Sequence, residues 1–325
     1  MFEIIIPIIF LTNLIFYLKL NFLAEKINIY DFPDKKRKIH KLKVPAIGGF
    51  IFIFNILIYF LLDSLFFDEI YNLDTAYFII FIILIFLLGA YDDKYNLNYK
   101  IKLIYFVIIL ALYLLFDNQQ IVQTLRFSSS STNISLGDFS LIFTILSIII
   151  FMNAFNMYDG INGQSTLYTI TIFSYLIFKE KFVILSCIIV LSSAFFLFSN
   201  LKEKIFLGDG GSLSLSFIFS ILIINYYNQS LDFACEEIFI LMMMPGIDLI
   251  RLFIQRIYKR KNPLKADNTH MHHLLTKKFN LKKAVFLNFL MMIIPIILMI
   301  LGINHLIIIL LFTSLYFFVL LGVYR

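Results

Sequence analysis

The chain has few charged residues and no tryptophan. Asp, Glu, Lys and Arg make up 15% of its 325 residues, whereas hydrophobic residues make up 61%, and the mean hydropathy is +0.90. Soluble domains contain about a quarter charged and about half apolar residues. The composition therefore excludes a soluble globular protein and indicates an all-α polytopic integral membrane protein.

Cysteine is also scarce, with two in the chain. Cys187 lies within an apolar run and Cys235 at the edge of a loop, so the pair does not predict a disulfide framework. The first apolar run begins at Met1, with no basic segment before it and no small-residue cleavage site after it. We therefore expect it to be retained as a span and not removed as a signal peptide.

Long apolar runs fill most of the sequence. A helix needs about 20 apolar residues to cross a bilayer, and by that measure we expect about eleven transmembrane helices, with ten as the alternative, in one domain over residues 1–325. The ninth run contains Pro245-Gly246, and because proline removes a helix hydrogen bond we expect a broken helix there. The predicted spans are 2–23, 46–66, 74–91, 101–117, 139–155, 165–178, 182–199, 212–228, 236–257, 284–302 and 305–324.

The basic residues are distributed unequally between the loops. The loops after odd-numbered spans, together with the C-terminus, hold 23 of the 27 Lys and Arg residues, and the other loops hold Arg126, Lys179 and Lys181. Because positive loops remain in the cytoplasm, we expect the N-terminus to lie outside and the odd-numbered loops to be cytoplasmic. The longest external loop, 122–138, has short β-prone runs around a Ser-rich turn, which predicts a small periplasmic β-hairpin.

Five polar segments interrupt the apolar pattern, and all of them fall in loops after odd-numbered spans. If the spans cross a bilayer, all five segments lie on its cytoplasmic face. A single site assembled from distant loops would require this arrangement, so we predict one composite site there. The segments are a basic stretch at 35–43, DDKYNLN at 92–98, NAFNMYDGING at 153–163, FLGDGGS at 206–212 and HMHH at 270–273.

Aspartates in these segments are candidates for metal or substrate binding. Asp92 and Asp93 are adjacent at the end of a span, where one carboxylate can face a ligand and the other a neighbour. Two solvated aspartates at a membrane boundary are the alternative. Asp209 lies in a Gly-rich turn before a helix, where its carboxylate could bind a divalent cation and backbone N–H groups could face phosphate. A simple turn explains this segment about as well.

The segment 153–163 carries polar residues at intervals of three. On a helical turn these groups form a ladder along one side, and Gly160 and Gly163 let the backbone approach a ligand. Ordinary helix capping by Asn and Gly is the alternative. The ladder consists of Asn153, Asn156, Asp159 and Asn162.

Three histidines, His270, His272 and His273, lie in a basic loop. Zinc is one interpretation, but no cysteine is near, and the acids within reach favour an oxygen-liganded cation such as Mg²⁺. Attraction of the loop to anionic lipid accounts for its lysines but not for three histidines in four residues. Acids that hold Mg²⁺ and cations that hold phosphate are the parts of a phosphoryl-transfer site, and the apolar surroundings indicate a lipid substrate.

In order and spacing, the five segments resemble the polyprenyl-phosphate N-acetylhexosamine-1-phosphate transferases, also called glycosyltransferase 4. HMHH and VPAIGG are similar to the WecA/TagO branch, whereas the alternative MraY branch, the phospho-MurNAc-pentapeptide transferases, usually has three consecutive histidines. The resemblance covers nearly the whole chain. It rests on YDFPDKKRKIHKLKVPAIGG (30–49), YDDKYNLN (91–98), NAFNMYDGING (153–163), FLGDGGS (206–212) and DNTHMHHLL (267–275).

The resemblance implies transfer of a HexNAc 1-phosphate, with GlcNAc as the first choice, from a UDP-sugar to undecaprenyl phosphate. UMP is released, and the product starts a cell-surface glycan. The implied location is the bacterial inner membrane, with a cytoplasmic active site. The implied cofactor is Mg²⁺ or Mn²⁺, the implied assembly is a homodimer, and no nucleic-acid partner is expected.

The resemblance also implies roles for individual residues. Asp209 would bind the metal, with the side-chain oxygen of Asn156 as a second ligand. The catalytic set would be Asp92, Asp93 and Asp159, the first two acting on the lipid phosphate. The nucleotide would contact Asn153, Asn162 and Phe206, the last by stacking on uracil. The phosphates would contact His270, His272, His273, Lys41 and His40.

One residue departs from the family pattern. Relatives commonly have a second acid where this chain has Asn162, followed by Gln164 in place of Leu. Asparagine can accept and donate hydrogen bonds but cannot act as an anion, which argues against metal binding or base catalysis at position 162. The implied mechanism is a single-step attack of the lipid phosphate on the β-phosphorus, with a two-step route through an aspartyl-phosphate as the competitor.

Two other classes of protein are alternatives. A transporter would have ionisable groups near the bilayer midplane, whereas nearly all acids here lie at the ends of spans. A non-catalytic membrane scaffold that kept the motifs is the other alternative, and in such a protein Asp93→Asn and Asp209→Asn would leave the cellular role intact.

Overall fold

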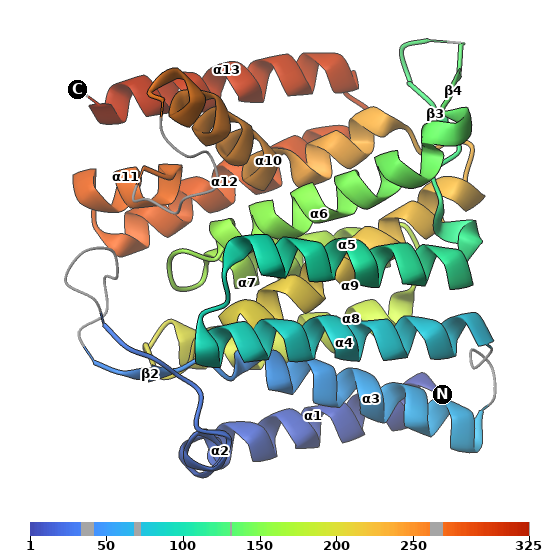
Figure 1. The fold of residues 1–325 in the computed structure, drawn as a ribbon. Coiled ribbons are helices and arrows are strands. Elements are labelled where there is room, and N and C mark those ends of the chain that lie inside the picture. The colour runs from blue at the N-terminus through green and yellow to red at the C-terminus, as the bar shows by residue number, and fades with distance from the viewer. Residues whose placement is uncertain (34–41, 68–72, 131, 261–268, 325) are drawn as a thin grey trace. The chain divides into compact units, whose positions relative to one another are not determined.

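The computed structural model describes residues 1–33, 42–67, 73–130, 132–260 and 269–324, and the chain in these ranges is almost entirely helical (Figure 1). The helices are α1 Phe2–Leu18, α2 Leu20–Ile27, α3 Gly48–Phe66, α4 Leu73–Tyr95, α5 Tyr99–Phe116, α6 Ser140–Tyr158, α7 Gln164–Phe178, α8 Val183–Asn200, α9 Gly208–Gln229, α10 Cys235–Tyr258, α11 Met271–Lys278, α12 Leu281–Ile300 and α13 His305–Tyr324, with 3-10 turns η1 Asn118–Gln120 and η2 Gly137–Phe139.

Every predicted span coincides with a helix, but fewer helices than predicted qualify as membrane spans. Within the described ranges, eight are long and apolar enough to cross a membrane, or nine if the α1–α2 pair, bent by 74°, is one span. This is below the predicted eleven and the alternative ten. α7 is not among the eight because its 15 residues extend about 22 Å, less than the bilayer core of about 30 Å. α10 is not among them either.

The predicted break in the ninth span does not interrupt the helix. α10 continues from Cys235 to Tyr258 with Pro245 inside it. Proline removes one hydrogen bond of the helix, and here the helical backbone continues on both sides of it. The helix is capped at its first turn, where the Glu237 side chain accepts a hydrogen bond from the Ala234 N–H at 2.9 Å.

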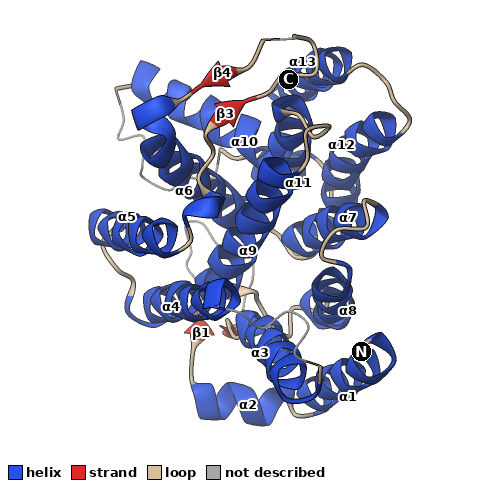
Figure 2. Cartoon of the chain, turned by 90° about the vertical axis from the view of Figure 1, so that its right-hand side faces the viewer, coloured by secondary structure: helices blue, strands red, loops and turns tan. Residues whose placement is uncertain are grey.

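Two short antiparallel strand pairs accompany the helices. β3 (Thr124–Leu125) pairs with β4 (Ile134–Ser135), which confirms the predicted hairpin near 122–138, and Figure 2 shows this pair in red. β1 (Tyr30–Asp31) pairs with β2 (Val44–Pro45). This second pair was not predicted from the sequence.

The chain forms two compact units. The first comprises residues 1–119 and 165–222, and the second comprises 120–164 and 223–325. In the first unit, α1, α3 and α8 pack on one another, as do α4 and α5. In the second, α10 packs against α6, α12 and α13. The single domain over 1–325 stays a prediction.

Buried polar groups in the first unit are hydrogen-bonded across helices. Asn55 of α3 donates to Asn13 Oδ1 of α1 at 3.1 Å and to Ser192 Oγ of α8 at 2.8 Å. All three side chains are buried. Such bonds hold membrane helices together because an unsatisfied polar group in hydrocarbon is costly.

Glycines bring α3 and α4 close to the first turn of α9. A Cβ added at Gly89 of α4 would lie 2.6 Å from Gly210 Cα, and one added at Gly49 of α3 would lie 2.6 Å from Gly211 Cα. Larger side chains would force these backbones apart, since real Cβ contacts are not that short. The glycines of FLGDGGS therefore serve helix packing at the place where α9 begins.

Candidate functional site

The first unit brings three predicted aspartates together with one lysine. Asp92 and Asp93 lie in the last turn of α4, Asp209 in the first turn of α9 and Lys102 in the first turn of α5. Lys102 Nζ donates to Asp92 Oδ2 at 2.7 Å and also to Asp209 Oδ2. We call these four residues the carboxylate cluster.

Asp93 is bound to the start of α9. Its Oδ1 accepts the Asp209 N–H at 2.9 Å and its Oδ2 accepts the Gly210 N–H at 3.1 Å. The first N–H groups of a helix have no partner within the helix, and they carry its positive end. Asp93 therefore satisfies two of these donors from a neighbouring helix.

Gly208 allows this approach. Its φ is +76°, a conformation that L side chains rarely adopt, and an added Cβ would lie 2.7 Å from Asp93 Oδ2. Asp92 is bound within its own turn, where Oδ1 accepts the Leu97 N–H at 2.6 Å. The carboxylates are thus oriented by backbone N–H groups and by one ammonium group.

The carboxylate cluster fits a hard divalent cation. Its donors are carboxylate oxygens without sulfur or imidazole, which is the set that Mg²⁺ prefers. Three carboxylates stand against the one ammonium group of Lys102, and the Asp209 side chain is 31% exposed. A cation that bound Asp209 would share its carboxylate with Lys102, which already orients it.

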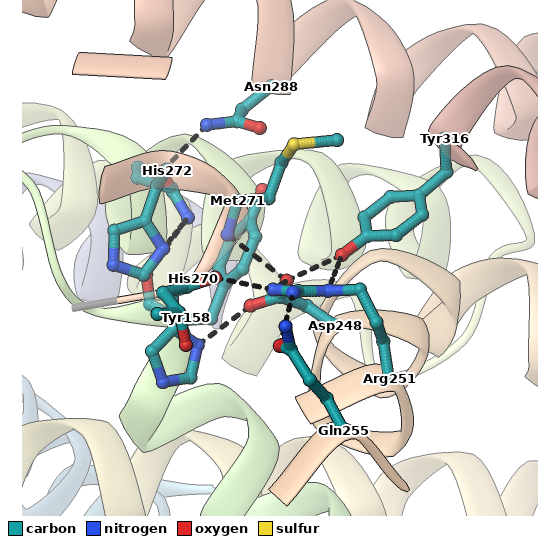
Figure 3. Close-up of polar contacts among 11 residues, drawn as sticks. Tyr158, Asp248, Arg251, Gln255, His270, Met271, His272, Asn288 and Tyr316 are labelled. Atoms are coloured by element: carbon teal, nitrogen blue, oxygen red, sulfur yellow. Dashed lines mark hydrogen bonds and ion pairs between the residues drawn. The ribbon is translucent and has the colours of Figure 1, made fainter. Parts of the chain in front are cut away.

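The second unit brings the histidines together at the start of α11. The rings of His270 and His272 stack with centroids 5.3 Å apart, and the centroids of His272 and His273 lie 4.3 Å apart. Figure 3 shows His270 and His272 beside Asp248 of α10, Arg251 and Tyr316. His270 Nδ1 lies 2.7 Å from Asp248 Oδ2.

His272 is fully enclosed. Burial lowers the pKa of His272 well below its usual range, and the neighbouring His273 and His270 lower it further, so the ring is neutral near pH 7. Its Nε2 is buried without a hydrogen-bond partner among the described residues, and it lies against Gly160.

Gln164, which departs from the family pattern, lies beside His272. Its Nε2 donates to the Tyr158 carbonyl at 3.0 Å and lies 3.5 Å from His272 Nδ1. Its Oε1 accepts from Asn288 Nδ2 at 3.1 Å. Gln164 thus connects the end of α6 to α12 beside the histidines, which a leucine could not do.

Asp248, His270 and His272 satisfy the spacing of a metal site, since one ligand atom of each lies within 4.8 Å of the others. The surrounding charges do not favour a cation there, because the Arg251 guanidinium is paired with the same carboxylate at 2.8 Å. The other oxygen of the Asp248 carboxylate, Oδ2, contacts His270 Nδ1. Among the described residues this group is therefore a hydrogen-bonded ion pair.

The remaining predicted residues lie in both units. Asn153 and Asn156 are in the last turns of α6, Asp159 follows its end, and Asn162 is in the turn before α7. Asn153 Nδ2 donates to the Ile149 carbonyl of its own helix at 2.9 Å. Phe206 lies in the first unit, where its N–H donates to the Pro45 carbonyl at 2.8 Å. Lys41 and His40 lie outside the described residues.

The predicted residues therefore form two groups. In the first unit, Lys102 bridges Asp92 and Asp209, and Asp93 accepts the Asp209 and Gly210 N–H groups. The second unit holds the 153–163 segment, whose Gly160 lies against His272. The composite site that would combine these groups stays a prediction.

Sequence reasoning missed four residues of these clusters. Lys102 lies two residues after Lys100 at the start of an apolar run, and Asp248 and Arg251 are opposite charges three residues apart in another run. An ionisable residue within a span is a functional candidate by default, so these three could have been found. Tyr316 carries no such signal, because it is one of 18 tyrosines in the chain.

Comparison with known proteins finds similarity to one family. A sequence model of the family described as Glycosyl transferase family 4 matches residues 75–227. The chain is 29% identical over 271 residues to the undecaprenyl-phosphate alpha-N-acetylglucosaminyl 1-phosphate transferase of Thermotoga maritima, covering 82% of this chain and 79% of that protein.

Two further relatives have similar names. The chain is 29% identical over 263 residues to the probable undecaprenyl-phosphate N-acetylglucosaminyl 1-phosphate transferase of Bacillus subtilis, covering 78% of this chain and 71% of that protein. It is 24% identical over 287 residues to the alpha-N-acetylglucosaminyl counterpart from Escherichia coli, covering 83% of this chain and 75% of that protein.

Proposed function

The chain belongs to glycosyl transferase family 4, and on that premise we propose that it transfers N-acetylglucosamine 1-phosphate from UDP-N-acetylglucosamine to undecaprenyl phosphate. The products are undecaprenyl-diphospho-N-acetylglucosamine and UMP. The relatives that carry this activity in their names align over about four fifths of the chain.

The observation that carries the proposal is the carboxylate cluster at the start of α9. The cluster has three carboxylates and one ammonium group, supplied by α4, α5 and α9. Backbone N–H groups hold Asp92 and Asp93, and Lys102 holds Asp209. A pre-oriented set of acids is what a phosphoryl-transfer site needs, since positioning and electrostatics supply most of the catalysis.

In the proposed reaction, an oxygen of the lipid phosphate attacks the β-phosphorus of the UDP-sugar. A new phosphorus–oxygen bond forms to the lipid phosphate, the bond to the oxygen bridging the α- and β-phosphorus breaks, and UMP leaves with that oxygen. Asp92 and Asp93 are the residues proposed to position or deprotonate the lipid phosphate, and Asp159 to lie beside the nucleotide. Both oxygens of Asp93 accept N–H groups of α9, which favours the single-step route over an aspartyl-phosphate on this residue.

We propose Mg²⁺, with Mn²⁺ as the substitute, as the cofactor. Asp209 would hold it, with Asn156 as the second candidate ligand. When bound, the cation would neutralise charge on the diphosphate and on the departing UMP. Lys102, which contacts Asp209 and Asp92, keeps both carboxylates oriented.

The other proposed roles concern substrate binding. Phe206 would stack on uracil, and Asn153 and Asn162 would contact the nucleotide. His270, His272 and His273, with Lys41 and His40, would contact phosphate oxygens. The proposed location is the inner membrane of a bacterium, with the site on the cytoplasmic side, where UDP-sugars are made.

The proposal is tested by UMP release. Purified protein with Mg²⁺, UDP-N-acetylglucosamine and undecaprenyl phosphate should release UMP, and removal of the metal with EDTA should stop the reaction. Asp209→Asn should lower kcat by about 10²- to 10³-fold, the usual cost of removing one group that stabilises transition-state charge. Glu203→Gln is the matched control, because Glu203 is an exposed acid in the loop before α9 and its loss should leave kcat within about twofold.

The absence of UMP with this donor would lead to a panel of other UDP-N-acetylhexosamines. Failure with every donor would overturn the proposed activity. Release of UMP with only another donor would keep the reaction and replace the sugar.

A further inference from the structure

Asp248 is a buried acid that none of the sequence motifs includes. It lies in α10, 5% exposed, and its neighbours Arg251 and Tyr316 are 8% and 0% exposed. Figure 3 shows the carboxylate at the centre of converging side chains from α10, α11 and α13. A buried carboxylate needs several hydrogen-bond or ion-pair partners to offset the free-energy cost of its desolvation.

The two oxygens of Asp248 have different partners. Oδ1 receives hydrogen bonds from Arg251 Nη2 at 2.8 Å, from the Tyr316 hydroxyl at 2.5 Å and from the Met271 N–H at 3.1 Å. Oδ2 faces His270 Nδ1 at 2.7 Å. One oxygen thus fixes the carboxylate in place, and the other meets the histidine.

Arg251 and Tyr316, which hold Asp248, make further hydrogen bonds. Arg251 Nη2 also donates to the Thr269 carbonyl at 2.7 Å, and its Nε lies 2.9 Å from the Tyr316 hydroxyl. Thr269 is the residue before His270. The same group of bonds therefore fixes the backbone on one side of His270, while the Met271 N–H bond fixes it on the other.

The carboxylate determines which nitrogen of His270 carries a proton. An ionised carboxylate only accepts hydrogen bonds, so at 2.7 Å the Nδ1 of His270 must carry hydrogen and donate. In the neutral ring Nε2 is then the acceptor, and in the charged ring both nitrogens donate. Both forms hold Nε2 in the same direction. The charged ring donates from Nε2 to a phosphate oxygen, whereas the neutral ring accepts from a protonated phosphate oxygen.

We propose that Asp248, clamped by Arg251 and Tyr316, is a positioning residue that holds His270 with Nδ1 protonated and presents Nε2 to a phosphate of the substrate. This inference rests on the proposed function, in which His270 contacts phosphate. Asp248 touches no reacting atom, and it acts through the ring of His270 and the first turn of α11.

Asp248→Asn is the variant that separates this role from simple packing. Three donors converge on Oδ1, so the single amide oxygen of asparagine will face them and its NH₂ group will face His270. An NH₂ group can only donate, so His270 Nδ1 must accept and the proton must move to Nε2. The variant keeps the shape of the side chain but reverses the tautomer.

The tautomer is measured by ¹⁵N NMR of protein labelled with ¹⁵N-histidine, with the His270 signals assigned by their loss in His270→Gln. We expect a protonated Nδ1 in the wild type and a protonated Nε2 in Asp248→Asn. Tyr316→Phe is the matched control, since it removes one donor from Oδ1 and leaves the contact at Oδ2, so the wild-type tautomer should remain. A wild-type tautomer in Asp248→Asn would overturn the proposal.

UMP release supplies the second readout. We expect Asp248→Asn to lower kcat by about 10- to 100-fold, a loss typical of residues that orient a ligand-binding side chain. If Asp248 acts through His270, the double variant with His270→Gln should be no slower than His270→Gln alone. Losses that multiply would show independent roles and contradict the proposal.

The two readouts also separate this inference from the proposed function. If the wild type releases no UMP with any donor, the transferase fails, but the NMR measurement still decides whether Asp248 sets the tautomer of His270. If UMP is released and the tautomer is insensitive to Asp248→Asn, the transferase stands and the positioning role does not.

Discussion

Gly160 leaves no room for a side chain beside the His272 ring. An added Cβ would overlap Nε2 and would lie 2.7 Å from Cε1 and 2.8 Å from Cδ2 of His272. His272 is buried, so its ring has little space to move away. The glycine is required here by the close approach of a neighbouring side chain and not by an unusual backbone angle.

We expect Gly160→Ala to lower the free energy of unfolding by about 1–3 kcal/mol, the usual cost of overpacking a filled site. It should also displace His272 and lower the rate of UMP release. Thermal melting in detergent and the UMP assay measure the two effects.

Gly322→Ala is the control for this substitution, since no atom lies within 4 Å of an added Cβ at Gly322. It should match the wild type in both measurements. An unchanged melting temperature and rate in Gly160→Ala would mean that the His272 ring moves aside freely.

At the scale of elements, the β3–β4 hairpin is attached to the end of α9. The Tyr227 hydroxyl donates to the Thr124 carbonyl at 2.9 Å and accepts the Arg126 N–H at 2.6 Å. The Arg126 guanidinium lies over the Tyr227 ring, with its carbon 3.9 Å from the centroid. An isolated two-stranded hairpin is marginal in water, so this hydroxyl stabilises it.

Tyr227→Phe removes both hydrogen bonds and keeps the aromatic ring. The two bonds together contribute about 1–3 kcal/mol, so we expect the Arg126 amide to exchange its hydrogen about 5- to 150-fold faster. Hydrogen–deuterium exchange read by mass spectrometry over residues 123–130 measures the change.

UMP release should stay within about twofold of the wild type, because the hairpin is predicted to lie on the external side. Unchanged exchange in the Tyr227→Phe variant would show that the strands are held without this anchor. A large loss of activity would contradict the external placement.

At the scale of the whole molecule, the charge distribution predicts how the chain is inserted. The loop that holds Lys202 and Lys204 belongs to the basic set, and the hairpin loop belongs to the set with few basic residues. The positive-inside rule places these two loops on opposite sides of the membrane. The proposed transferase reaction requires the basic side to be cytoplasmic.

Cysteine labelling tests this orientation. After both native cysteines are replaced by alanine, Ser130→Cys should react with an impermeant maleimide on intact cells. Lys204→Cys should react only in inverted membrane vesicles. Both positions are exposed, so they form a matched pair, and the reverse pattern would overturn the predicted insertion.

Much of this molecule could be inferred from local sequence. Helices form where apolar runs occur, because a backbone in lipid must satisfy its own hydrogen bonds, and each predicted span does contain a helix. The hairpin near 122–138 and the adjacency of Asp92 and Asp93 are also local. Within the described residues, eight helices, or nine with the α1–α2 pair as one span, are long and apolar enough to cross a membrane, fewer than the eleven expected. One reason is that α7, with 15 residues, is a helix but is too short to cross a bilayer.

Only the tertiary structure determined which buried polar and charged side chains contact one another. Lys102 contacts Asp209, 107 residues away, and Asp248 contacts Tyr316, 68 residues away. Such pairs depend on how helices pack, which residue spacing along one helix does not encode. The sequence by itself therefore determined the helices, the residue types and the class of chemistry, and the fold determined the partners, because a buried charge is stable only where packing brings its counterpart.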